Sequence, residues 1–181
     1  MHDYIDSYGN LTLKTLSGFH WLLKHCPNIR FFLKIDDDMW VNVPALLNLL
    51  QKEEKNLQTA VGGNCRSQAE PIRHASSKWY ASFKSYPQPL YPGYCSGTAY
   101  TSSLNVARSV VRVSPDVPFF HLEDVYVSLC IRELGGNFVL KPLPGFYHAH
   151  AEACVLRAPE TVTVHEVSAK RLLDIWSAKC P

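Results

Sequence analysis

Hydrophobic residues follow a helical spacing near the start of the chain and an extended pattern soon after it. From Asn10 to His25 apolar side chains recur every three or four positions, which predicts an amphipathic helix. Pro27 lies just beyond and is expected to end this helix. The next apolar run, at 31–35, is Phe-Phe-Leu-Lys-Ile. Its aromatic and β-branched residues predict a buried strand.

The same two patterns predict the other elements. Further strands are expected at 59–63, 79–83, 95–100 and 162–165, and further helices at 44–50, 103–113, 122–134 and 168–178. Pro44 fits the first turn of its helix, Ser168 can cap the last helix, and Gly135 is a natural C-terminal cap. Strands and helices alternate without a repeat or a linker. The chain is therefore expected to form a single α/β layered domain.

The strand at 31–35 runs directly into three carboxylates, Asp36, Asp37 and Asp38. Ligands of open α/β sheets gather beyond the carboxyl ends of strands. Three adjacent carboxylates repel one another unless a cation lies among them. Mg²⁺ and Mn²⁺ take carboxylate oxygens and can also hold a substrate's phosphates. The motif therefore indicates a metal that binds a diphosphate; the alternative is an acidic turn with a solvated face.

Two acids and three histidines are further candidates for chemistry. Glu123 and Asp124 begin a predicted helix, where acids often serve as ordinary caps, but a carboxylate there could also act as a general base. His165 ends a β-branched run and is either structural or a metal ligand beside carboxylates. His148 and His150 alternate, but no acid lies beside them in the sequence, so both are expected to be structural.

Aromatic residues are concentrated around a proline-rich and tyrosine-rich segment at 85–93. Aromatic rings are costly to leave in water, so this segment is expected to be an ordered loop near a ligand. Trp79, Tyr80, Tyr91 and Tyr94 either pack within the core and loop or stack on the faces of sugars.

Composition narrows the class of protein. The 181 residues suit one domain, and with 46% hydrophobic and 19% charged residues the chain should be globular throughout. The net charge of +2 gives no support for a nucleic-acid or membrane-surface binder. No apolar stretch reaches the ~20 residues of a membrane span. The chain enters a helical pattern almost at once, so we expect a domain that lacks its N-terminal part.

The cysteines exclude some sites and leave the redox state open. Six are scattered along the chain without a CxxC pair, which argues against a zinc ribbon or a thioredoxin-type site. They are either reduced and mostly buried or joined in up to three disulfides. Asn10-Leu11-Thr12 is a glycosylation sequon, a weak signal when taken alone.

An ordered set of short motifs is more specific than any of these features. In chain order the set consists of Asp6-Ser7-Tyr8-Gly9-Asn10-Leu11-Thr12-Leu13-Lys14-Thr15, Lys34-Ile35-Asp36-Asp37-Asp38, Lys78-Trp79-Tyr80, Tyr91-Pro92-Gly93-Tyr94-Cys95-Ser96-Gly97-Thr98-Ala99-Tyr100, Glu123-Asp124-Val125-Tyr126-Val127 and Val164-His165-Glu166. Together these motifs strongly resemble the β1,3-galactosyltransferase family, which includes β1,3-N-acetylglucosaminyltransferases. The resemblance covers nearly the whole chain.

The resemblance implies a fold, a reaction and a location. The fold is GT-A, with a Rossmann-like nucleotide-sugar portion at about 1–63 and an acceptor-binding portion at about 64–181. The reaction is the inverting transfer of galactose or N-acetylglucosamine from UDP-galactose or UDP-N-acetylglucosamine to the 3-OH of a glycan on a glycoprotein or glycolipid. The family is similar to Golgi type II membrane enzymes that use Mn²⁺, with the catalytic domain on the lumenal side. Membrane attachment would need an anchor that this sequence does not contain.

Residue roles also follow from the resemblance. The acid triplet Asp36, Asp37 and Asp38 corresponds to the DxD-type motif, with Asp38 as the main carboxylate ligand of the metal and the other two supporting nucleotide and metal. His165 would complete the metal shell, and Asp124 would be the catalytic base. Contacts to acceptor or donor are expected from Lys78, Trp79, Tyr80, Tyr94, Gly97 and Glu123, and Asn10 is the expected glycosylation site.

The implied secretory lumen predicts at least one disulfide, with Cys95 and Cys130 as the first pair to consider. The chain departs from the family pattern in two respects: it lacks the N-terminal stretch that holds uridine, and it has Ala99 where glycine is common. These departures favour one alternative, a catalytically inactive carbohydrate-binding remnant. A second alternative, a metal-dependent phosphodiesterase, would need more scattered His and Asp ligands than the sequence offers.

Overall fold

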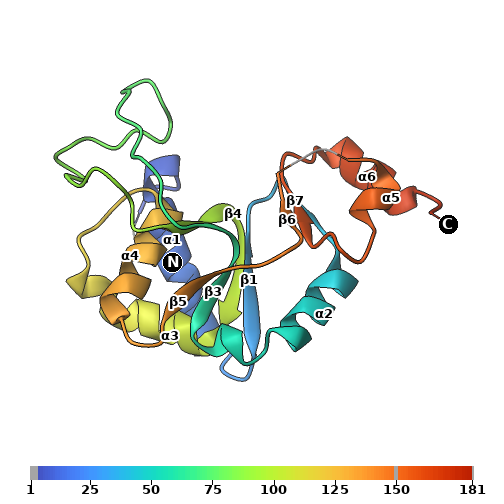
Figure 1. Ribbon diagram of the computed structural model, residues 1–181, viewed down its shortest axis with the longest axis horizontal. Helices are drawn as coiled ribbons and strands as arrows, with labels where there is room; N and C mark the ends of the chain where they lie inside the picture. The colour runs from blue at the N-terminus through green and yellow to red at the C-terminus, as the bar shows by residue number, and fades with distance from the viewer. Residues whose placement is uncertain (1–3, 149–150, 181) are drawn as a thin grey trace.

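The computed structural model describes residues 4–148 and 151–180. Its main sheet has four strands in the order β1-β4-β3-β5 (Figure 1). Their bounds are Phe31–Ile35 for β1, Ala60–Arg66 for β3, Tyr94–Ser103 for β4 and Val139–Pro142 for β5. Strand β4 is antiparallel to both β1 and β3, whereas β3 and β5 are parallel. The mixed sheet flanked by helices agrees with the predicted GT-A-like α/β fold.

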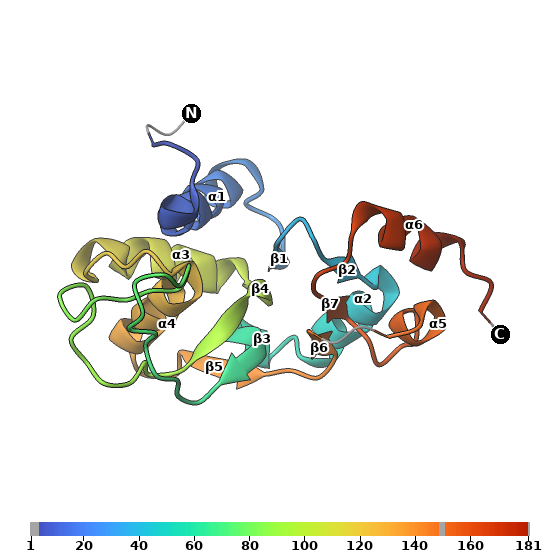
Figure 2. The same cartoon turned by 90° about the horizontal axis from the view of Figure 1, so that it is seen from above.

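Helices cover both faces of this sheet. Helices α1 (Leu11–His25), α3 (Leu104–Val113) and α4 (Glu123–Leu134) lie on one side, and α2 (Val43–Lys52) lies on the other (Figures 1 and 2). Strand β1 serves both cores because its side chains alternate between them. Phe32 packs into the cluster of α1, α3 and α4, while Phe31, Leu33 and Ile35 pack against α2.

Strand β1 corrects one detail of the sequence prediction. Its five residues are half-buried rather than fully buried. In the described part of the chain β1 pairs with β4 alone and therefore forms an edge of the sheet. A continuous apolar run identifies a strand with two covered faces, but it carries no information about the hydrogen-bonding edge.

A second, smaller unit is built from the C-terminal residues and the segment after β1 (Figure 1). Its sheet has the order β2-β7-β6, with β2 at Trp40–Val41, β6 at Phe146–Tyr147 and β7 at Thr163–Val164. Helices α5 (Ala153–Leu156) and α6 (Ala169–Ser177) complete it. The pairing of β2 with β7 brings the chain after the acid triplet next to the C-terminal segment.

Capping explains several helix boundaries, and the predicted caps are confirmed. Helix α2 has Pro44 in its first turn, and its N-cap Asn42 accepts a hydrogen bond from the backbone of Ala45. Ser168 accepts one from the backbone of Arg171 at the start of α6. Gly135 ends α4 with a φ of 57°, a left-handed value that glycine adopts without a steric penalty.

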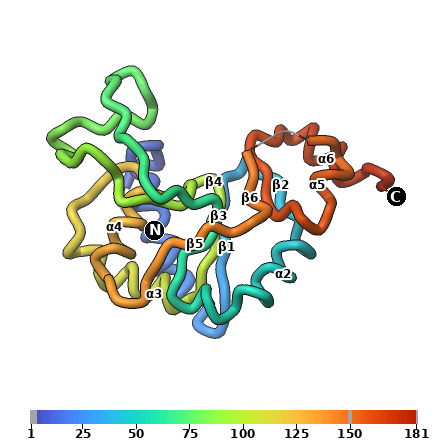
Figure 3. The backbone as a smooth tube through the Cα atoms, viewed as in Figure 1, coloured from blue at the N-terminus to red at the C-terminus, as the bar shows by residue number. Residues whose placement is uncertain are grey.

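The segment between β3 and β4 contradicts the predicted strand at 79–83. It forms a long irregular excursion above the main sheet (Figures 1 and 3), and residues 79–83 are turns and bends apart from an isolated bridge between Ile72 and Tyr80. The alternating aromatics do not build one pleated face. Phe83 is 69% exposed, with the Arg73 guanidinium 4.2 Å from its ring centroid, whereas Ala81 is fully buried.

Two disulfides confirm that the chain forms at least one. They join Cys65 to Cys95 and Cys154 to Cys180. The pairing of Cys95 with Cys130 was wrong. Cys65 and Cys95 are directly opposite on β3 and β4, whereas Cys130 is a free cysteine buried inside α4. Strand register, which the sequence does not reveal, decides the partner. Among the described residues no helix is both long and apolar enough to cross a membrane.

Candidate active site

A pocket of about 510 Å³ opens beyond the carboxyl end of β1, where ligands of open α/β sheets are expected. The predicted residues Asp36, Lys78, Trp79, Tyr94, Gly97, Glu123, Asp124 and His165 all line it. Tyr80 does not line this pocket. Residues from both predicted portions of the chain therefore meet around one cavity, whose volume lies in the usual range of small-molecule binding sites.

Asp36, Asp38 and His165 form a potential metal-binding group. Each offers one ligand atom, and these atoms all lie within 4.8 Å of one another. His165 Nε2 lies 3.3 Å from Asp38 Oδ2. Asp37 is exposed and does not belong to the group. The structure thus brings two of the three triplet carboxylates together with the C-terminal histidine.

The local backbone explains how these side chains converge. The Asp36 amide donates to the Thr98 carbonyl at 3.0 Å, which extends the β1–β4 pairing into the acid turn. On the other side, the Val167 amide donates to the Asp38 carbonyl at 2.8 Å. Glu166, between His165 and Val167, has a φ of 60°. Non-glycine residues rarely adopt this conformation, and it persists where surrounding contacts hold it.

The donor set suits a divalent cation such as Mn²⁺. Carboxylate oxygens match hard cations, and imidazole is tolerated by Mn²⁺ beside them. The Asp38 side chain is half exposed, so the group is open to a ligand.

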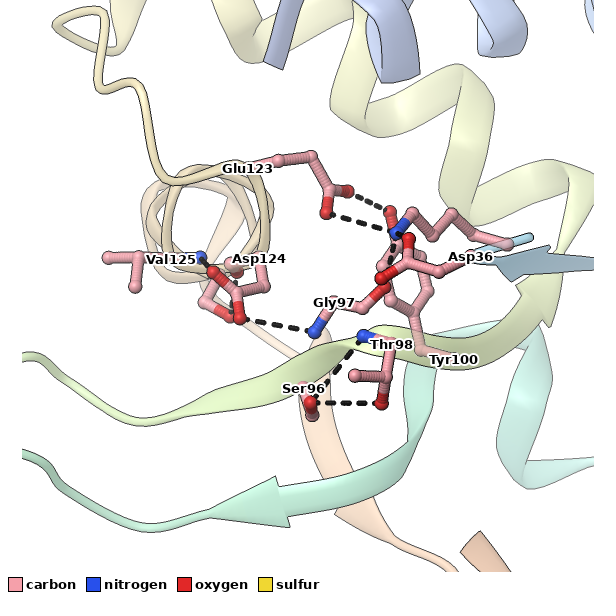
Figure 4. Close-up of polar contacts among 10 residues, drawn as sticks. Asp36, Ser96, Gly97, Thr98, Tyr100, Glu123, Asp124 and Val125 are labelled. Atoms are coloured by element: carbon pink, nitrogen blue, oxygen red, sulfur yellow. Dashed lines mark hydrogen bonds and ion pairs between the residues drawn. The ribbon is translucent and has the colours of Figure 1, made fainter. Parts of the chain in front are cut away.

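The two acids at the start of α4, Glu123 and Asp124, have different hydrogen-bond partners (Figure 4). Glu123 is only 5% exposed, and its Oε1 accepts a hydrogen bond from the Tyr100 hydroxyl at 2.5 Å. Asp124 accepts from two backbone amides, Gly97 at 3.1 Å and Val125 at 2.9 Å. The contact with Val125 is local, to the next residue in the first turn of α4, whose N-cap is Leu122. The contact with Gly97 reaches across to β4, so capping alone does not account for Asp124.

Burial governs the protonation of both acids. It raises the pKa of Glu123 to about 7, against the opposing effects of the Lys34 ammonium and the Tyr100 hydroxyl. Burial also raises the pKa of Asp124, while hydrogen bonds from the Gly97 and Val125 amides act against that rise. A carboxylate with a raised pKa that lines a pocket suits proton transfer near neutral pH.

Gly97 permits the close approach of β4 to α4. A Cβ at this position would lie 3.2 Å from Glu123 Oε2 and 3.4 Å from Asp124 Cβ. The contact with Glu123 is tighter than an ordinary van der Waals contact, so a side chain here would push that carboxylate away. Glycine at this position therefore reflects the packing of the site.

An aromatic wall closes another side of the pocket. Trp79 is 49% exposed, and the Lys78 ammonium lies 4.7 Å from its ring centroid and 5.9 Å from that of Tyr8. Tyr94 and Tyr91 pack edge to face with ring centroids 6.2 Å apart. Partly exposed rings of this kind offer flat apolar faces to a ligand.

Sequence reasoning missed several residues at this site. Lys34 lies two positions before Asp36, so strand periodicity alone could have placed both side chains on one face. Tyr100 and Tyr8 gave no comparable signal, because only the folded chain brings them near the acids. His148, expected to be structural, lines the pocket with its ring centroid 5.6 Å from that of His165. His150 lies outside the described residues.

Comparison with known proteins gives the family. Residues 1–139 match the galactosyltransferase family. The chain belongs to this family. It is 40% identical over 179 residues to beta-1,3-galactosyltransferase 5 from Pan paniscus, covering 97% of this chain and 58% of that protein. It is 37% identical over 179 residues to beta-1,3-galactosyltransferase 1 from Mus musculus, covering 98% of this chain and 54% of that protein. The chain thus spans less than two thirds of the length of these relatives.

Proposed function

We propose that the protein is a metal-dependent, inverting hexosyltransferase. It would move galactose or N-acetylglucosamine from a UDP-sugar to the 3-OH of an acceptor glycan and so form a β1,3 linkage. One observation carries the proposal. Asp36 and His165 of the potential metal-binding group line the same pocket as Asp124. Diphosphate binding and proton removal would therefore occur within one cavity.

Asp36, Asp38 and His165 would hold the cation, with Mn²⁺ as the expected ion. When bound, it supplies positive charge that neutralises the diphosphate of the departing UDP. Arg66 also lines the pocket and would add a second positive charge toward the phosphates. Asp37, exposed outside this group, would serve the nucleotide rather than the cation.

Asp124 would act as the general base. Its carboxylate accepts the proton from the acceptor 3-OH as that oxygen attacks the anomeric carbon of the donor sugar. The bond to UDP breaks on the opposite face, and UDP leaves with the bonding electron pair. One displacement of this kind inverts the anomeric configuration, so an α-linked donor yields a β-linked product.

The aromatic wall would bind sugar rings. Trp79 and Tyr94 offer apolar faces, and Lys78 offers a donor for hydroxyl oxygens beside Trp79. Glu123 and Gly97 complete this side of the pocket. The hydroxyl groups of the acceptor sugar would form hydrogen bonds here. This wall is therefore expected to determine which acceptor glycan binds.

The proposed setting is the lumenal side of the Golgi membrane. Disulfides persist in such oxidising compartments, and the structure holds two. Asn10 would carry a glycan; it lies partly exposed just before α1, with its amide donating to the Ile5 carbonyl at 2.8 Å. These are proposals for the whole protein.

The test is direct transfer. The purified chain is incubated with UDP-galactose or UDP-N-acetylglucosamine, Mn²⁺ or EDTA, and a panel of glycans with different terminal sugars; the product linkage is read by NMR. Mn²⁺-dependent formation of a β1,3 linkage, abolished by Asp124→Asn but not by the exposed control Asp116→Asn, supports the proposal. Glycan binding without transfer from either donor would favour the carbohydrate-binding alternative.

A further inference from the structure

The Lys34 ammonium lies between the two halves of the site. It pairs with Asp36 Oδ1 at 2.6 Å and donates to the Gly97 carbonyl. It also lies 3.8 Å from Glu123 Oε2. The side chain is only 19% exposed. One largely buried cation therefore contacts the metal-binding strand end, the backbone of β4 and the acid pair.

Gly97 connects this cation to Asp124. Its carbonyl accepts from Lys34, while its amide donates to Asp124 Oδ2 (Figure 4). The two groups flank the same α-carbon, and glycine adds no side chain to stiffen the backbone there. The orientation of the Gly97 backbone, and with it the donor to Asp124, therefore depends on a partner for its carbonyl.

Glu123 needs the same cation for a different reason. Its carboxylate is buried, and its partners are the side chains of Tyr100 and Thr15 and the Lys34 ammonium. A buried carboxylate without a counter-charge is strongly unfavourable and moves or takes up a proton. Any movement of Glu123 would disturb Asp124, because the two are adjacent residues in the first turn of α4.

We infer that Lys34 is a positioning residue that holds Gly97 and Glu123 in place and thereby fixes the carboxylate of Asp124. The inference rests on the proposed function, in which Asp124 takes the proton from the acceptor. Lys34 does not need to touch the substrate in this role. Lys34 also contacts Asp36, at the strand end that would hold the cation. The positions of Asp124 and of this strand end are therefore linked through Lys34.

A change at Lys34 should alter the titration of Asp124 in a defined direction. The ionisable groups that act on or around Asp124 come from several elements: Lys34 and Asp36 from β1 and the turn after it, Tyr94 and Tyr100 from β4, Glu123 from α4, and Tyr8 and Tyr91 from the surrounding segments. Lys34 favours the charged form of Asp124 and of Glu123. Its removal should raise the pKa of both carboxyls.

The experiment compares Lys34→Met, Lys34→Met/Glu123→Gln and Lys141→Met in the full chain. Lys141 is a matched control, because it is a half-buried lysine of the main sheet that pairs with Glu53, 3.2 Å away, outside the pocket. Carboxyl carbons of labelled Asp and Glu are titrated by NMR, with Asp124→Asn assigning the Asp124 signal. Lys34→Met should shift the titration midpoint of the Asp124 carboxyl to higher pH. In the double variant most of this shift should disappear. Lys141→Met should leave the Asp124 midpoint unchanged.

The inference is overturned if the Lys34→Met variant folds and the titration midpoint of its Asp124 carboxyl stays at the wild-type value. If Lys34→Met fails to fold, the double variant decides, because it removes the uncompensated carboxylate together with the cation. A double variant that also fails to fold makes Lys34 a general structural residue and equally overturns the inference.

Turnover separates this inference from the proposed function. In an active enzyme, Lys34→Met should lower kcat by roughly 10–100-fold, the range expected for a misplaced catalytic group. It should also move the acid limb of the pH–rate profile to higher pH, which a merely structural defect would not do. If the wild-type chain transfers no sugar, the proposed function fails, while the NMR titration still decides whether Lys34 controls Asp124.

Discussion

The acid pair lines the same pocket as Asp36 and His165 of the potential metal-binding group, yet the two groups differ in how many protein partners they have. Glu123 is buried and has a hydroxyl and an ammonium as partners, and both Asp124 oxygens accept backbone amides. Asp38, by contrast, is half exposed and faces His165 at 3.3 Å. The protein itself therefore supplies partners for both acids of the pair, whereas the Asp38 carboxylate remains open to a ligand from solution. In the proposed function, this contrast would separate a preorganised general base from a metal site that a bound cation completes.

The largest expected effect is on the preorganised side. Asp124→Asn keeps the size of the side chain but removes the base, so turnover should fall by roughly 10²–10⁴. Because the triplet and His165 remain, binding of UDP and Mn²⁺ should persist, which calorimetry would show. Near-normal turnover of Asp124→Asn together with an inactive Glu123→Gln would reverse the assignment of the base. Normal turnover of both would leave the pair as a helix cap.

The next largest effect is expected at the proposed metal site. Asp38→Ala should weaken Mn²⁺ binding by more than about 100-fold, since loss of a supporting partner outside the ligand shell already costs roughly 10–100-fold. Asp37→Ala is the matched control, because Asp37 is adjacent but lies outside the group. Titration monitored by EPR measures both affinities. Equal losses in the two variants would contradict a site made by Asp36, Asp38 and His165.

Glu123 should contribute to the pH dependence of the unfolding free energy. Its pKa is about 7 in the folded protein against 4.5 ordinarily, so the folded state binds more protons between these values. Unfolding free energy should therefore fall as pH rises from about 4.5 to 7. The loss could reach about 3 kcal/mol from a shift of this size. Glu123→Gln should remove this part of the decline.

Urea denaturation of wild type and Glu123→Gln at pH 5 and pH 8 measures the effect. The variant should gain stability relative to wild type at the higher pH. Glu133→Gln is a suitable control, since Glu133 is exposed near the other end of α4. If wild type and Glu123→Gln lose the same stability between the two pH values, Glu123 does not carry a raised pKa.

Local signals in the sequence explain which parts of the fold were predictable. Helices α1 and α4 combine apolar periodicity with clear ends, namely Pro27 and Gly135, and the structure matches both predictions closely. The strand expected at 79–83 failed because alternating aromatics also arise in a loop that anchors single side chains. The partner of Cys95 failed for another reason: it depends on the register of β3 and β4, which no local pattern encodes.

The candidate site divides in the same way. The acid triplet, the acid pair and His165 stood out because their residue types and positions carry chemistry, and five of these six residues gather as ligands or around the pocket. Lys34 and Tyr100 did not stand out, because their roles come from a strand order of β1-β4-β3-β5 that places them beside Glu123. Residues whose type carries chemistry are easier to predict from sequence than residues whose contacts depend on the strand order.

The smallest expected effect lies at the contact between β4 and α4. Gly97→Ala would place a Cβ 3.2 Å from Glu123 Oε2, so this carboxylate must shift by a few tenths of an ångström, whereas the contact of 3.4 Å with Asp124 Cβ is an ordinary one. Overpacking of this kind typically costs roughly 1–3 kcal/mol of stability. Because the displaced Glu123 is adjacent to Asp124 while the triplet stays in place, turnover should fall more than Mn²⁺ affinity does. Gly18→Ala is the control, since nothing lies within 4 Å of its added Cβ. Thermal denaturation, turnover assays and calorimetric Mn²⁺ titration of both variants test the prediction. If the Gly97→Ala protein is as stable and active as Gly18→Ala, α4 can move without loss of stability or activity. The acid pair would then be less rigid than its contacts indicate.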